Sequence, residues 1–460
     1  MRILLITPKE EKLRWLNKYP TVHYAPLNLQ ILASLTPNEE VKIVDENFDD
    51  VDFDEDYDLV GITLHSSSNI MRTKELYEEF KKRNMPVVIG GPPLSSTPIK
   101  DLLKCADSIV LGEGEGAWER VVKDVKNNKL KRIYQNKELV DLSKLETLPR
   151  RDLTKNKDYL VHRIEIARGC IHNCDYCTIV KFNRGKYRTY KIERIIREVE
   201  QCLDYPAQIK KAIYFADSNI AVKPHYKIEL FRKLIPYNIA WFVQSDISIA
   251  KNEKLLGVLA KSGCLELHIG FESVNQDSLD SVNKLVNRVS EYKKAVKTLH
   301  DYGICVYGFF MLGLDGDKPG VAKKTLDFIS EAGIDFATAF IATPNYGTGF
   351  FERVKKEGRL LTKDQPKYNR EYAVFQPKNM TPEQLEEEHK WFVNHANPPY
   401  LGNVFNLAKR VLVKKQILNR NVKFSTKLSV LSNYVCYNGI YYRIIRKMHR
   451  KLLRLLKRVK

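Results

Sequence analysis

Three cysteines stand close together in the middle of the chain, Cys170, Cys174 and Cys177, with the spacing Cys-x3-Cys-x2-Cys. They follow an apolar run at 162–167, so we expect them on a loop that leaves a strand. Thiolates that converge from one loop are suited to an iron–sulfur cluster or to zinc. A [4Fe–4S] cluster held by three thiolates keeps one iron open for a substrate or cofactor. A structural zinc ion takes a fourth ligand, for which His172 is the nearby candidate.

The apolar run before the cysteines is the first of six that predict parallel strands. Helical stretches such as 192–203, 251–261 and 289–300 separate these runs. Six β/α units are fewer than the eight of a closed TIM barrel, so the pattern predicts a partial (β/α)6 barrel that is open on one side. The six runs are 162–167, 211–216, 240–245, 265–271, 304–312 and 335–343. The polar residues at their carboxyl ends are Asp217, Ser218, Gln244 and Glu272.

A separate alternation of apolar runs and helical stretches precedes this barrel. Continuous apolar strands separated by helices predict a doubly wound, Rossmann-like domain with a parallel sheet. The expected strands are 3–7, 41–45, 59–64, 87–90 and 108–111. Ligands of such domains bind at the carboxyl ends of the strands, where Gly90, Gly91 and Gly112 let a ligand approach the backbone. The predicted organisation is a doubly wound domain at 1–140, a linker at 141–160, the barrel at 161–345 and a mainly helical region at 346–460.

The cysteine spacing with Tyr176 before the last cysteine resembles the hallmark of the radical S-adenosylmethionine (SAM) enzymes. In that superfamily the three cysteines hold a [4Fe–4S] cluster whose fourth iron binds SAM, and reductive cleavage of SAM gives a radical that abstracts hydrogen from an unactivated carbon. The resemblance implies that Cys170, Cys174 and Cys177 are the metal ligands. It also implies SAM contacts for Tyr176 and for the strand-end residues Asp217, Ser218, Gln244 and Glu272. The adenosyl ribose hydroxyls are expected at Glu272.

The order of the two domains resembles the cobalamin (B12)-binding subgroup of these enzymes. Matching stretches are 24–29, 44–47, 89–92 and 112–115, and the regions 343–360 and 377–383 resemble hopanoid methylases and related lipid-modifying members. The resemblance implies a cobalamin site that includes Gly90, Gly91 and Gly112. The Asp-x-His-x-x-Gly motif that supplies an axial histidine in many B12 enzymes is absent. His65 is an alternative axial ligand or an ordinary polar loop residue.

The charge of the chain is concentrated at one end. The formal charge is +20, but residues 401–460 hold 16 Lys and Arg and no Asp or Glu, so the rest is nearly neutral. Apolar residues recur at three- and four-residue steps between 441 and 460, with cations on another face, which predicts a basic amphipathic helix. Such a helix suits a membrane surface, an RNA partner, or docking on its own protein.

The composition excludes several classes of protein. With 43% apolar and 29% charged residues the chain is globular, and it lacks the uncharged apolar run of about 20 residues that spans a membrane. Eight cysteines, three of them clustered, indicate a reducing compartment. We therefore expect a cytoplasmic enzyme, with membrane association through its tail, that receives electrons from a reducing donor and acts on an apolar, lipid- or terpenoid-like substrate.

The resemblance makes cobalamin-dependent C-methylation the expected reaction. Without cobalamin, radical carbon–carbon bond formation or desaturation of a lipid is the alternative. An RNA-modifying enzyme and a cluster-bearing sensor are further alternatives; no added RNA-binding module follows the barrel, so a nucleic-acid partner is not expected.

Overall fold

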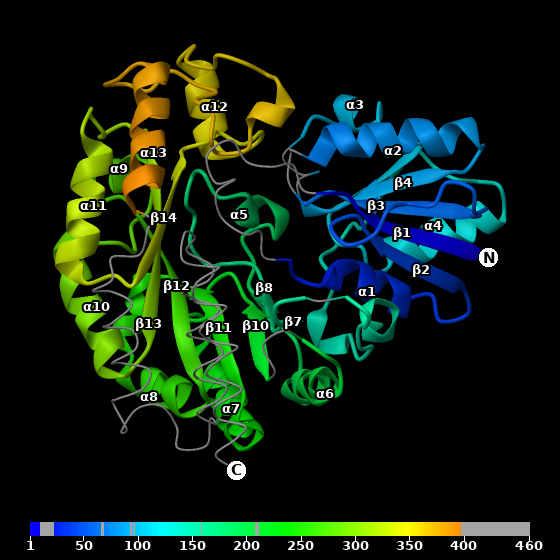
Figure 1. Ribbon diagram of the computed structural model, residues 1–460, viewed down its shortest axis with the longest axis horizontal. Coiled ribbons are helices and arrows are strands. Elements are labelled where there is room, and N and C mark those ends of the chain that lie inside the picture. The colour runs from blue at the N-terminus through cyan, green and yellow to red at the C-terminus, as the bar shows by residue number, and fades with distance from the viewer. Residues whose placement is uncertain are drawn as a thin grey trace, which may run out of the picture.

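The computed structural model describes residues 1–9, 23–65, 69–92, 94, 97–157, 159–207 and 211–396. It contains two parallel six-stranded sheets, here called sheet A and sheet B, which lie side by side with α5 (Thr178–Phe182) between them (Figure 1). The basic segment 441–460, with its expected amphipathic helix, lies outside the described residues. Within the described ranges, no helix is long and apolar enough to cross a membrane.

Sheet A has the strand order β2-β1-β3-β4-β5-β6, and all of its pairings are parallel. Its strands are β1 (Arg2–Thr7), β2 (Glu40–Asp45), β3 (Leu59–Thr63), β4 (Val87–Gly90), β5 (Ser108–Leu111) and β6 (Ile133–Gln135). Its helices are α1 (Leu27–Ser34), α2 (Ile70–Lys82), α3 (Ile99–Leu102) and α4 (Ala117–Lys126). Alternate strand residues face two separate apolar cores, which confirms the doubly wound fold. The sequence did not predict β6.

Sheet B has the order β14-β13-β12-β11-β10-β7, so the first and last strands of the series are its two edges. Its strands are β7 (His162–Glu165), β10 (Ala212–Ala216), β11 (Ala240–Ser245), β12 (Cys264–Glu272), β13 (Cys305–Leu312) and β14 (Phe336–Ile341). The helices on its outer face are α6 (Ile192–Leu203), α7 (Pro224–Leu234), α8 (Glu253–Lys261), α10 (Tyr292–Asp301) and α11 (Val321–Ala332) (Figure 1). This is the open, partial barrel that the sequence predicts.

Three further helices and a short hairpin complete the described part of sheet B's surroundings. The hairpin pairs β8 (Ala167–Arg168) with β9 (Arg188–Thr189), and α9 (Gln276–Ser281) follows β12. Beyond β14 the chain forms α12 (Gly349–Lys356) and α13 (Pro382–Ala396), and α13 lies against β14. Arg151, in the stretch predicted as a linker, is buried and donates hydrogen bonds to Glu198 Oε1 (2.6 Å) and Arg163 O (2.8 Å). This stretch is therefore fastened to sheet B.

Two buried histidines predict that the protein loses stability in mild acid. His389 on α13 is fully buried with Nε2 3.0 Å from Ala339 O, and burial lowers its pKa to about 4. Burial likewise lowers the pKa of His162 to about 4. Both rings are neutral in the folded state but bind a proton in the unfolded state below pH 6.5, so their contribution is complete above pH 6.5 and is lost as the pH falls toward 4. For each histidine, the free energy of unfolding lost between pH 6.5 and pH 4 is up to about 3 kcal/mol.

Urea unfolding at several pH values between 7.5 and 4 measures this effect. The His389→Gln variant is the comparison, because glutamine does not titrate and its stability should fall less steeply below pH 6.5. Parallel stability curves for the two proteins would contradict the assignment.

Candidate functional site

The three cysteines lie on the loop between β8 and α5, and none of them forms a disulfide. Gly169 opens this loop at a φ of +100°, and a Cβ there would lie 1.9 Å from Lys186 O. Two hydrogen bonds fix the far side of the loop, from Asp175 N to Val282 O (3.0 Å) and from Asn283 Nδ2 to Asn173 O (2.7 Å). The backbone that carries the thiols is therefore held in place by neighbouring elements.

The donor set of this loop fits a cluster with three protein ligands. Burial raises the pKa of the Cys174 thiol to about 11 and also raises that of Cys177, so metal binding must displace their protons. His172 Nε2 lies 2.6 Å from Asp246 Oδ2, so this ring nitrogen already has a partner within the protein. Within the part of the chain that the structure describes, no three His, Cys, Asp or Glu side chains surround a single metal-ion position. Three sulfur donors without a fourth ligand leave one iron of a [4Fe–4S] cluster open.

A polar network lies next to Cys170, at the carboxyl ends of β10 and β11. Asn219 Nδ2 donates to Asp246 Oδ2 (2.6 Å) and lies 4.0 Å from Cys170 Sγ. Burial acts to raise the pKa of Asp246, but hydrogen bonds from His172, Ser248 and Asn219 outweigh it and lower the pKa to about 2. We did not predict Asn219 or Asp246 from the sequence. Their position just beyond the ends of two apolar strands was the signal that could have identified them.

The structure separates the predicted residues of the β10 and β11 ends into two kinds. The buried Asp217 carboxylate already has partners within the protein, because its Oδ2 accepts hydrogen bonds from Lys227 and from the Tyr187 hydroxyl (2.7 Å). Ser218 is half-buried and Gln244 is exposed, and neither side chain makes a hydrogen bond to the described residues. Ser218 and Gln244 can therefore contact a ligand without breaking an existing bond.

Tyr176 and Glu272, both predicted from the sequence, meet in the structure. The Tyr176 hydroxyl donates to Glu272 Oε1 (2.8 Å), and Lys284 Nζ lies 3.1 Å from the same oxygen. Glu272 has a φ of +64°, and Asn287 Nδ2 holds the strand end before it by donating to Phe271 O (2.9 Å). Lys284 was not predicted, because it comes from a loop twelve residues downstream that has no distinguishing pattern.

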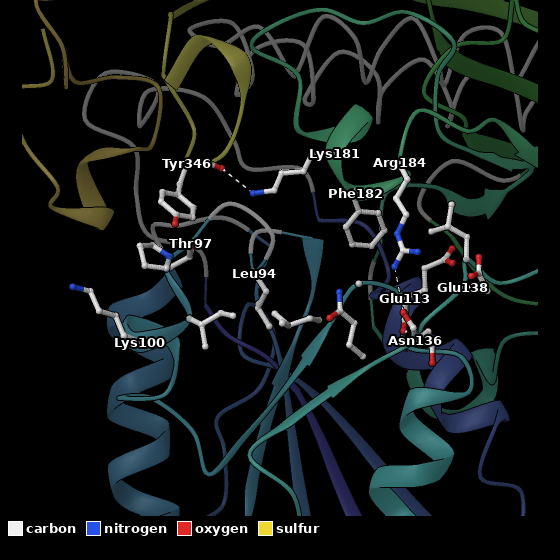
Figure 2. Close-up of a pocket in the computed structure, with 16 residues that line it drawn as sticks. Leu94, Thr97, Lys100, Glu113, Asn136, Glu138, Lys181, Phe182, Arg184 and Tyr346 are labelled. Carbon is white, nitrogen blue, oxygen red and sulfur yellow. Dashed lines mark hydrogen bonds between the residues drawn. The ribbon is translucent and has the colours of Figure 1, made fainter. Parts of the chain in front are cut away.

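A cavity of about 510 Å³ lies at the carboxyl edge of sheet A, where doubly wound domains bind their ligands (Figure 2). Gly112 lines this cavity with a φ of +84° and no atom within 4 Å of its Cβ position, so the backbone there is open to a ligand. Lys181, Arg184 and Tyr346 reach it from the side of sheet B. Such a cavity, between two α/β units, fits part of a large cofactor.

The other two predicted glycines are placed differently. Gly90 and Gly91 are absent from the residues that line this cavity. Gly91 has a φ of +125°, and a Cβ there would lie 2.2 Å from Leu64 O, so close backbone packing alone requires glycine at this position. His65, directly after β3, has an exposed side chain without a hydrogen-bond partner among the described residues.

Two carboxylates join the sheet A cavity to the cysteine loop. Glu113, which lines the cavity, accepts hydrogen bonds from Arg168 Nη1 (2.8 Å) and from Arg188 (2.9 Å), and Glu115 accepts from Arg168 Nη2 (2.6 Å). Arg168 is two residues before Cys170. The Gly-Glu-Gly-Glu segment thus fixes the cysteine loop relative to sheet A through buried ion pairs.

Two segments of the chain match known protein families. Residues 164–329 match the family model of the Radical SAM superfamily, and residues 19–122 match that of the B12 binding domain. The chain is 28% identical to bacteriochlorophyllide d C-12(1)-methyltransferase of Chlorobaculum tepidum, over 82% of this chain and 83% of that protein. It is 24% identical to hopanoid C-2 methylase of Rhodopseudomonas palustris, over 81% of this chain and 73% of that protein.

Among solved structures, the fold resembles the radical S-adenosylmethionine methyltransferase TsrM from Kitasatospora setae with cobalamin and a [4Fe-4S] cluster bound. The TM-score is 0.67 at 14% identity, and the match covers 99% of both chains. At this identity the likeness concerns the fold alone.

Proposed function

Because this chain belongs to the radical SAM superfamily and carries a B12-binding domain, we propose that it methylates an unactivated carbon of an apolar, lipid- or terpenoid-like substrate. It is a radical SAM enzyme of the B12-dependent methyltransferase type, and its cofactors are a [4Fe–4S] cluster, SAM and cobalamin. When bound, these groups supply a hydrogen-abstracting radical and a carrier for the methyl group. The observation that carries the proposal is the three-thiol loop tied by Arg168 to the edge of sheet A.

The side chains of the site divide the work of holding these cofactors. Cys170, Cys174 and Cys177 bind the cluster, and the Asn219–Asp246 pair keeps the loop's surroundings polar beside Cys170. Glu272, oriented by the Tyr176 hydroxyl and Lys284, accepts hydrogen bonds from the ribose hydroxyls of SAM.

The exposed strand-end residues complete the proposed cofactor sites. Ser218 and Gln244 offer polar contacts to the amino-acid part of SAM, whereas Asp217 supports the same strand end through its bonds to Lys227 and Tyr187. Gly112 gives cobalamin access to the backbone of the sheet A cavity, with Gly90 and Gly91 shaping the adjacent strand end.

An apolar substrate is supported by the inner face of sheet B. Alternate residues of β10 to β14 project from this face, and a set of half-buried rings runs across it from strand to strand. We call this set the aromatic face: Tyr214, Phe242, His268, Phe309 and Phe340. When an apolar molecule covers rings that are only half-buried in the folded protein, their remaining apolar surface is removed from water, which favours binding. The substrates named for the two relatives, a bacteriochlorophyllide and a hopanoid, belong to those proteins.

The bound-cofactor spectrum after anaerobic purification with cobalamin supplied tests this function. We expect cobalamin and iron–sulfur absorption together, and 5′-deoxyadenosine formation that depends on a reductant. With SAM labelled as trideuteromethyl, an apolar extract from cells that lack the gene should gain a product in which one hydrogen is replaced by the labelled methyl group. Protein that binds the cluster but no cobalamin would exclude methyl transfer by this route.

A further inference from the structure

The aromatic face ends at an arginine. The guanidinium of Arg370 lies over the Phe340 ring, 5.1 Å from its centroid, and Phe340 stacks with Phe309 at 6.4 Å between centroids. His268 lies 5.7 Å from Phe309 and 5.7 Å from Phe242, so the ring contacts are continuous from β14 to β11. The arginine therefore stands at the β14 edge of an apolar surface whose opposite edge, β7, leads into the cysteine loop.

Among the residues that the structure describes, no carboxylate is paired with Arg370. Its side chain is exposed and makes no ion pair or hydrogen bond with any of the residues that the structure describes. Arg72 and Arg150 show the usual situation, since each donates hydrogen bonds to a carboxylate, that of Glu46 and that of Asp152 respectively.

The backbone holds Arg370 in a conformation that its side chain disfavours. Its φ is +72°, in the left-handed region, and its carbonyl oxygen accepts a hydrogen bond from Ile341 N (2.9 Å). This bond ties the residue to the carboxyl end of β14, where the polar strand-end residues of the sheet also lie. A strained backbone that holds an exposed guanidinium beside a row of rings, without an ion pair to any described residue, is typical of a ligand-binding position.

The size of the aromatic face limits the kind of molecule that covers it. Five adjacent strands, β10 to β14, contribute to it, and neighbouring strands are about 4.8 Å apart, so it is roughly 19 Å wide. Guanidinium groups lie against rings at both ends of it, Arg370 over Phe340 and Arg163 at 6.0 Å from the centroid of Tyr214. In the middle of the sheet Glu266 is buried and paired with His268 (2.6 Å). Arg370 is exposed whereas Arg163 is half-buried, so Arg370 is the more accessible of the two to an anion.

We propose that the methyl-accepting substrate is an amphiphilic anion, whose large polycyclic or conjugated apolar body covers the aromatic face while Arg370 binds its carboxylate or phosphate group. This rests on the proposed function, which it narrows from any apolar molecule to one with a single anionic end. The guanidinium forms a bidentate, charge-assisted pair with either anion, and the rings cover the apolar body. Because both parts of the substrate are bound, its reacting carbon is held at a fixed position relative to Arg370.

Matched probes test the charge preference directly. We would measure binding to the reconstituted holoenzyme by equilibrium dialysis, using pyrenebutyric acid, its methyl ester and the phosphate monoester of pyrenebutanol, and protoporphyrin IX with its dimethyl ester as a larger scaffold. The wild type should bind at least one of the anions about 10- to 100-fold more tightly than the neutral ester of the same scaffold. The carboxylate and phosphate arms show which anion is preferred. Equal binding of anions and esters on both scaffolds, or no binding at all, would overturn the proposal.

Variants assign the preference to Arg370. Arg370→Gln should remove it while ester binding remains, and Arg370→Lys should keep part of it because the positive charge is retained. Arg2→Gln is the matched control, since Arg2 also lies over a ring, that of Tyr57, but is paired with carboxylates in sheet A. A preference that survives in Arg370→Gln refutes the assignment. Reductant-dependent SAM cleavage by the wild type is measured separately, so failure of the anion site is distinguishable from failure of the proposed function.

Discussion

Replacing Cys174 with alanine is expected to abolish reductive SAM cleavage while leaving the fold intact. Cys174 is one of the three thiols of the loop, and without it two sulfur ligands remain, too few to hold the cluster and keep only one iron open. Loss even of groups that merely support a metal ligand reduces activity by about 10- to 100-fold, so loss of a ligand itself should reduce 5′-deoxyadenosine formation by more than about 100-fold. The backbone bonds of Asp175 and Asn173 hold the loop without the thiol.

Iron and sulfide content, together with the rate of 5′-deoxyadenosine formation, measure this result after anaerobic reconstitution. Cys202→Ala is the matched control, because Cys202 is buried on α6, a helix on the outer face of sheet B, and does not belong to the cysteine loop. It should retain the cluster and full SAM cleavage. Reductant-dependent cleavage by Cys174→Ala at the rate of the control would show that the cluster is held elsewhere.

The sequence was sufficient to predict the elements that have a local signal. The buried strands are continuous apolar runs, and the cysteine loop has its own spacing, so both were identified from short windows of sequence. The strand β6 was missed because it is three residues long and only Tyr134 of them is buried. An edge strand this short has no periodicity that distinguishes it from a loop.

Contacts between distant parts of the chain could not be predicted in this way. The Gly-Glu-Gly-Glu segment was recognised as a strand end, but its pairing with Arg168 joins residues 55 apart in sequence. The aromatic face likewise depends on register, since Phe242 and His268 become neighbours only when β11 and β12 pair with a bulge between Trp241 and Phe242. Arg370 belongs to this surface through a loop beyond the barrel, which the barrel pattern does not include.

Replacing one member of the buried Asp217–Lys227 pair is expected to destabilise the protein strongly. The pair also shows that a residue can lie at a predicted strand end and still have a structural role. Both side chains are completely buried, and Lys227 comes from α7, the helix that follows the strand end. Removing one member leaves an uncompensated buried charge, which costs about 3–5 kcal/mol. Lys227→Met and Asp217→Asn should each reduce the free energy of unfolding by that amount. The double variant should lose much less than the sum, since two neutral side chains replace the pair.

SAM binding by the same variants separates a supporting role of Asp217 from direct contact with the cofactor. If Asp217 acts only through the strand end that it holds, the double variant should recover SAM affinity together with stability, whereas each single variant loses both. Urea unfolding and equilibrium dialysis of SAM on the reconstituted protein give the two quantities. A double variant that is stable yet fails to bind SAM would show that the Asp217 carboxylate itself contacts the cofactor. The neighbouring Ser218 provides the comparison, since its half-buried side chain has no internal partner among the described residues, and Ser218→Ala should weaken SAM binding with little change in the free energy of unfolding.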